Sequence, residues 1–103
     1  MPDTSPFLSA VEQFADRLRA APQSRLQRGA AARALALAQA LATRAQEREE
    51  PGTAPRLMPD AGMFAVADQL TVAAHDLAAV LRTADEVEEA TALVTEARAE
   101  ANL

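Results

Sequence analysis

The stretch AVLRTADEVEEA, residues 79–90, decides the architecture of this chain, because it either continues one long helix or separates two. It contains neither Gly nor Pro, so no residue in it forces a helix to stop. Thr83 and Glu86, however, have the spacing of a capping box, in which each side chain accepts the free backbone N–H of the other residue. Asp85 and Glu88 add negative charge where the N-terminus of a new helix favours it.

The apolar residues on the two sides of Thr83 also favour two helices. Leu70 and Leu77 belong to one stripe before it, whereas Val87 and Val94 belong to another stripe after it. On a straight helix these two stripes would point in different directions. We therefore predict a break or sharp kink near Thr83, and the alternative is one kinked helix through this stretch.

The composition favours helices throughout the chain. Half of the 103 residues are hydrophobic, and most of these are Ala or Leu, the strongest helix formers. Trp, Tyr and Ile are absent and Phe occurs three times, so the β-branched and aromatic residues typical of strands are scarce. We therefore predict an all-α fold in a single domain over residues 1–103.

Capping and breaking signals place four helices near residues 5–21, 24–49, 60–82 and 84–101. Ser5 followed by Pro6 is typical of a helix start. Ser24 with Gln27 has the spacing of a second capping box, and Asp60 is expected to cap the third helix. Three prolines within residues 50–59 mark the linker between the middle pair of helices.

The second predicted helix is apolar over roughly half of its circumference, wider than the ~100° stripe of a surface helix, so we expect it to contact two neighbours. Very short turns join the first helix to the second and the third to the fourth, and short connections favour antiparallel neighbours. The prediction is a small antiparallel helical bundle of four helices, unless the third and fourth form one kinked helix.

Charge is distributed unevenly along the chain, whose net charge is −5. Residues 1–50 hold seven Arg and six acids, whereas residues 51–103 hold three Arg and nine acids. A run of Arg residues without an intervening acid forms a candidate anion patch across the first predicted turn: Arg17, Arg19, Arg25 and Arg28. Because the total charge is acidic and no aromatic residues are interleaved, nucleic acid is not the expected partner.

The residues needed for known catalytic or metal chemistry are mostly missing. No cysteine is present, and His75 is the single histidine, without a second metal ligand or a nucleophile in its pattern. The three glycines stand apart, so there is no phosphate-binding loop. We expect neither an enzyme nor a bound cofactor or metal.

Nothing in the sequence points to a membrane. The N-terminus MPDTSPF lacks the basic region of a signal peptide. The longest weakly polar run, residues 29–42, is shorter than the about 20 apolar residues that span a bilayer. A cytoplasmic protein is the expectation.

The apolar stripes of the third and fourth helices point in different directions. If each helix packs against a single antiparallel neighbour, part of this apolar surface stays uncovered, which predicts self-association, with a dimer favoured. The candidate interface combines these stripes with apolar residues outside them: Phe64, Leu70, Val72, Leu77, Val87 and Val94. The predicted function is that of a non-enzymatic helical module that binds another protein, a second copy of itself included.

Two other functions stay open at this level. A small regulator could contact nucleic acid through the Arg segment, or mask a basic partner as an antitoxin or anti-regulator does. A helical bundle could also hold a small apolar ligand in its interior.

Overall fold

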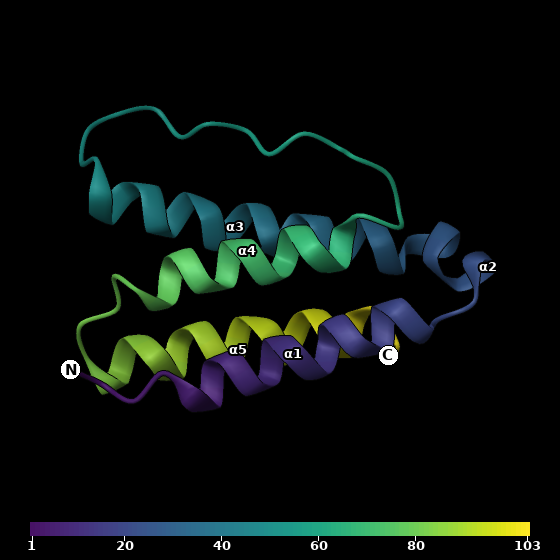
Figure 1. Ribbon diagram of the computed structural model, residues 1–103, viewed down its shortest axis with the longest axis horizontal. Coiled ribbons are helices and arrows are strands. Elements are labelled where there is room, and N and C mark those ends of the chain that lie inside the picture. Colours follow the sequence, from purple (N-terminus) through teal and green to yellow (C-terminus); the bar gives the residue numbers. More distant parts are fainter.

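The computed structural model describes all 103 residues and contains helices but no strands (Figure 1). The predicted all-α fold with four principal helices is confirmed. These are α1 (Ser5–Ala20), α3 (Ala31–Glu49), α4 (Val66–Ala78) and α5 (Ala84–Glu100). Two short helical segments, α2 (Gln23–Arg25) and η1 (Leu26–Ala30), lead into α3.

The predicted break near Thr83 is present between α4 and α5. Thr83 Oγ1 accepts the backbone N–H of Glu86 at 3.1 Å, and Glu86 Oε1 accepts the N–H of Thr83 at 3.1 Å. The same carboxylate oxygen accepts the N–H of Arg82 at 2.7 Å. The capping box therefore forms as predicted, and it starts α5 in a chain that has no Gly or Pro at this point.

Three other helix starts differ from the prediction. The Asp3 carboxylate, rather than the Ser5 side chain, accepts an N–H at the start of α1, from Ser5 at 2.9 Å. Ser24 makes no capping hydrogen bond, because the helix already begins at Gln23, after Pro22. Asp60 Oδ1 bonds the N–H of Gly62 at 3.0 Å instead of capping a helix, and α4 begins only at Val66. The linker is accordingly longer than predicted and covers residues 50–65.

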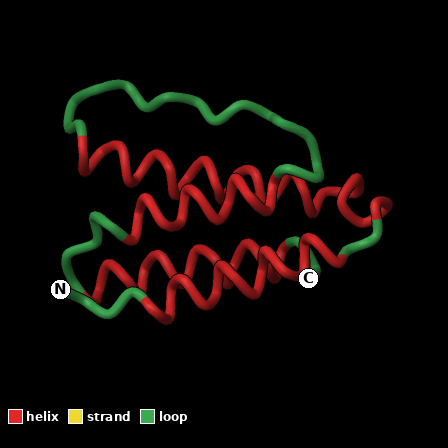
Figure 2. The backbone as a smooth tube through the Cα atoms, viewed as in Figure 1, coloured by secondary structure: helices red, strands yellow, loops and turns green.

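This linker carries the chain back along the whole length of α3, so that α3 and α4 run parallel (Figures 1 and 2). Helices α1 and α5 run parallel to each other and antiparallel to that pair. Helix α3 packs against both α4 and α5, which confirms that its broad apolar face contacts two neighbours, and α1 also packs against α4 and α5. The bundle thus combines antiparallel and parallel neighbours, and the long linker is its crossover connection.

Three glutamine side chains hold the crossover linker against the helices. Gln46 Oε1 accepts the N–H of Arg56 at 2.7 Å, and Gln39 Oε1 accepts the N–H of Met58 at 2.5 Å. Gln69, on α4, donates to the carbonyl of Pro59 at 2.8 Å. These hydrogen bonds hold the linker in place. They also satisfy backbone N–H and C=O groups that have no partner in a helix or sheet.

The core consists entirely of hydrophobic residues and is dominated by small ones. All 24 buried residues form one cluster, and 11 of them are Ala. Phe7 and Phe14, both on α1, are its two aromatic members and are fully buried. Small side chains let the helices approach closely. The space that remains between the helices is filled mainly by Leu and Phe side chains.

Gly29 produces a kink within η1, ahead of α3. Its φ of 136° and ψ of −14° lie where residues with a side chain rarely occur, although an added Cβ would meet no atom within 4 Å. Gly29→Ala is expected to lower the free energy of unfolding by about 1–2 kcal/mol through backbone strain alone. Urea unfolding followed by far-UV circular dichroism measures this change.

The exposed Gln27 in the same turn provides the matched control, because Gln27→Ala should change stability by no more than about 0.5 kcal/mol. Equal stability of Gly29→Ala and the wild-type protein would show that the kink does not depend on glycine.

Candidate partner-binding groove

Most of the predicted interface lies inside the chain's own core, which corrects the prediction. Leu70, Leu77, Val87 and Val94 are all buried, with exposed fractions between 0% and 5%. The stripes on α4 and α5 do point in different directions, but the crossover connection gives each helix two neighbours that cover its stripe. All four stabilise the fold; Leu70, Leu77 and Val94 are not available to a second molecule, and only Val87 also reaches the edge of a surface groove.

Phe64 and Val72 are the two predicted interface residues that lie on the surface. Phe64 is 75% exposed just before α4, and Val72 is 60% exposed two turns further along. Leu57, in the crossover linker, is also exposed. Single apolar side chains on a surface are common and indicate nothing by themselves. Phe64 and Val72 are a stronger indication of a contact surface because both are large and lie near the same helix.

The predicted anion patch is partly used within the fold. Arg19 pairs with Asp68 of α4 at 2.8 Å, and Arg25 donates to the carbonyl of Asn102 at 3.1 Å. Arg17 and Arg28 are exposed and make no ion pair. Two unpaired Arg side chains are too few for the multiple phosphate contacts on which nucleic-acid binding relies.

His75 lies beside a groove between α1 and α4, together with Glu12, Asp16 and Arg19. The side chain is exposed, and no group of three or more His, Asp or Glu residues is arranged to hold a metal ion. Two carboxylates, Glu12 and Asp16, line the groove with His75, but no hydrogen bond or ion pair joins either of them to the imidazole.

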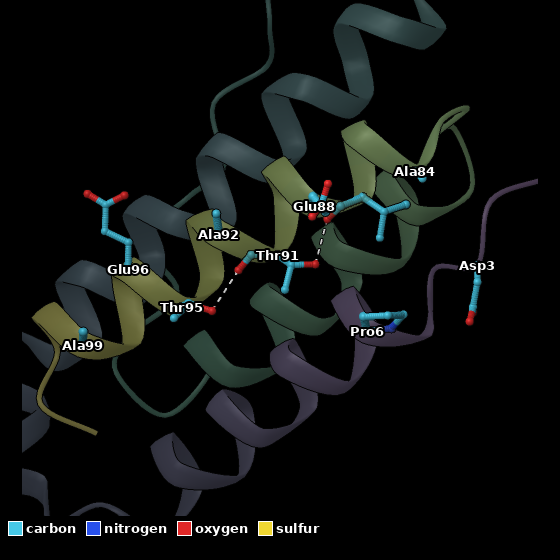
Figure 3. Close-up of a pocket in the computed structure, with 10 residues that line it drawn as sticks. Asp3, Pro6, Ala84, Glu88, Thr91, Ala92, Thr95, Glu96 and Ala99 are labelled. Atoms are coloured by element: carbon cyan, nitrogen blue, oxygen red, sulfur yellow. Dashed lines mark hydrogen bonds between the residues drawn. The ribbon is translucent and has the colours of Figure 1, made fainter.

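A more extensive groove follows the outward face of α5 (Figure 3). Its volume is about 730 Å³, and its far wall is the N-terminal segment with Asp3 and Pro6. The floor and the near wall come from small or apolar residues of α5, with two glutamates among them: Ala84, Val87, Glu88, Thr91, Ala92, Thr95, Glu96 and Ala99. One continuous helix face therefore supplies nearly the whole surface.

The hydroxyl groups of the two threonines in the floor are hydrogen-bonded within α5. Thr91 Oγ1 donates to the carbonyl of Val87 at 2.7 Å, and Thr95 Oγ1 donates to the carbonyl of Thr91 at 3.1 Å (Figure 3). Because these hydroxyl groups are already bonded to their own helix, they do not require a polar ligand. The floor is thus largely apolar.

Negative charges surround this apolar floor. Glu88 and Glu96 are exposed and lack ion pairs, and Asp3 lies on the opposite wall. Hydrogen bonds from the side chain and the backbone of Ser5 hold the pKa of Asp3 below its ordinary value, so this carboxylate stays charged well into the acidic range. A ligand of this groove meets an apolar centre with acidic edges.

Comparison with known protein families, with curated proteins and with solved structures finds no match to this chain. None of its helices combines the length and the apolar character needed to cross a bilayer.

This groove was not predicted from the sequence. Asp85 and Glu86 lie in the first turn of α5, as expected of acids near a helix N-terminus, whereas Glu88 lies beyond that turn and lines the groove. The signal that could have revealed the groove is the helical spacing of small residues between acids: Ala84, Thr91, Ala92, Thr95 and Ala99. On most surface helices the solvent-facing side carries polar and charged residues, whereas here Ala and Thr lie between the acids.

Proposed function

We propose that this protein is a non-enzymatic interaction module that binds another protein through the groove along α5. The observation that carries the proposal is the apolar floor of this groove, which is exposed and whose threonine hydroxyl groups are already bonded within α5. A groove of methyl groups between two helices is a typical docking surface for a protein segment. No cluster of reactive side chains accompanies it, which favours binding over catalysis.

Site-specific photo-crosslinking in the native cell tests this proposal. A photoreactive phenylalanine analogue at Ala92 lies in the groove, and the same analogue at Ala36 lies on the exposed face of α3. We expect a discrete protein adduct from position 92 that is absent from position 36. Adducts of the same size from both positions, or none from position 92, would contradict the proposal.

A second candidate is self-association through the outward face of α4, which the exposure of Phe64 and Val72 favours. In that case light scattering finds a mass above the 10.9 kDa of one chain, and Val72→Asp returns it to one chain. A concentration-independent mass of 10.9 kDa in the wild-type protein would rule this candidate out.

A further inference from the structure

The net charge of the protein resides on one helix. Helix α5 contains six acids and one Arg, for a net charge of −5, and this equals the net charge of the whole chain. The other residues contain nine acids and nine Arg and are neutral as a set. Whatever binds α5 therefore experiences most of the electrostatic field of the molecule.

Most of the charge on α5 is not compensated within the fold. Glu86 pairs with Arg48, and Glu100 pairs with Arg33 at 3.1 Å. The other four acids of α5 are exposed and have no ion pair: Asp85, Glu88, Glu89 and Glu96. Since Glu88 and Glu96 also line the groove, uncompensated negative charge and apolar floor occupy the same helix face.

We propose that the α5 groove binds a basic amphipathic helix of a partner protein, an inference that rests on the proposed function. The apolar stripe of such a helix lies on the methyl floor, and its flanking Lys or Arg residues face the acids of α5. Charge complementarity of this kind guides the approach of a partner and selects against acidic ones. The floor spans residues 84–99, which corresponds to a helix of about four turns.

The shape of the groove favours a helix over other occupants. Small residues such as Ala92 and Ala99 permit close approach of a second helix axis, as in small-residue helix contacts generally. No strand is present to which an extended peptide could add. Nucleic acid and anionic membrane surfaces are repelled by the acids that line the groove.

A second copy of this chain does not supply the required surface. Its unpaired basic residues include Arg17 and Arg28, but the apolar faces of the helical segments that carry them are buried in the core. Docking of one copy on another would therefore need partial unfolding. The occupant is accordingly a different chain.

Titration with synthetic peptides tests the assignment on the full-length protein. The probe is a helical peptide of about 18 residues with a Leu stripe flanked by Lys, compared with a Lys→Glu counterpart and a scrambled sequence of equal composition. Fluorescence anisotropy gives the affinity at low and at physiological salt. We expect saturable binding of the Lys peptide alone, and affinity that falls as salt is added.

Two matched pairs of variants locate the binding site. The double variant Glu88→Gln with Glu96→Gln is expected to weaken peptide binding about five- to tenfold at low salt. The control is the double variant Glu49→Gln with Asp76→Asn, which removes the same charge elsewhere on the surface. It is expected to change the affinity less than about twofold. Thr95→Trp fills the groove and is expected to weaken binding at least about tenfold. Ala36→Trp on α3 is its control.

Several results would overturn the inference. Equal binding of the Lys and scrambled peptides, or equal weakening by the groove and control variants, would show non-specific attraction to an acidic protein. If crosslinking at Ala92 captures a partner but the Lys peptide does not bind, the basic helix is the wrong occupant and the proposed function stands. If both fail, the groove is not a docking site.

Discussion

Leu70→Asp is expected to unfold the chain, whereas the same substitution two residues away at Val72 leaves it folded. Leu70 is 0% exposed, and Val72 is 60% exposed on the opposite side of α4. Aspartate at position 70 loses the packing of a buried Leu and places a carboxylate where no donor is available, for a combined effect of at least about 4 kcal/mol. Such a loss is comparable to the lower end of the stability expected for a small domain, about 5–15 kcal/mol.

Far-UV circular dichroism and urea unfolding distinguish the two variants. Val72→Asp should stay within about 0.5 kcal/mol of the wild-type protein, because Val and Asp have similar helix propensities and the site is open to water. If the Leu70→Asp variant stayed folded and light scattering gave a lower mass than for the wild-type protein, Leu70 would lie in an interface between chains. That result would contradict its place in the core. The pair thus separates a core residue from a surface residue with a single type of substitution.

The helix break at Thr83 could be predicted from the sequence because the capping box is a local interaction between Thr83 and Glu86. A capping box depends on residues three positions apart, so no distant packing is needed to form it. Ser24 and Gln27 have the same spacing, yet the helix there begins one residue earlier and kinks at Gly29. The kink depends on a positive φ angle, which glycine adopts readily. The helical spacing of the apolar residues gives no sign of such an angle.

The parallel arrangement of α3 and α4 could not be derived in the same way. A Pro-rich linker long enough to turn back is also long enough to cross the bundle, so its length does not determine the direction of the next helix. What selects the crossover is a set of contacts between residues far apart in the chain, such as Gln39 with Met58 and Gln69 with Pro59.

The same reasoning explains why the predicted interface was wrong at four positions. Periodicity identifies an apolar stripe, but it does not show which helix covers the stripe. Val87 and Val94 suggested an uncovered face only while α5 was expected to have one antiparallel neighbour. With α1 and α3 both packed against α5, that face is closed, and the open face is the one made of Ala and Thr.

Glu86→Ala is expected to lower the free energy of unfolding by about 2–3 kcal/mol, a large effect for a residue outside the core. Its carboxylate accepts two backbone N–H groups at the start of α5, a capping interaction worth about 1 kcal/mol. The same carboxylate pairs with Arg48 of α3, and both side chains are partly shielded from water. Because the Arg48 side chain is 36% exposed, water partly replaces this partner, and loss of the ion pair adds about 1 kcal/mol.

Glu86→Gln separates these two contributions, because a Gln side chain retains a capping oxygen while removing the negative charge. We expect Gln to lower the free energy of unfolding by about 1 kcal/mol in urea unfolding, and Ala to lower it by about twice that or more. Glu88→Ala, on the exposed face of the same helix, is the control and should change stability by less than about 0.5 kcal/mol. If Glu86→Ala were no more destabilising than Glu88→Ala, the break between α4 and α5 would depend on core packing alone. A large effect instead shows that one carboxylate both starts α5 and holds it against α3, and so fixes the helix that carries the groove.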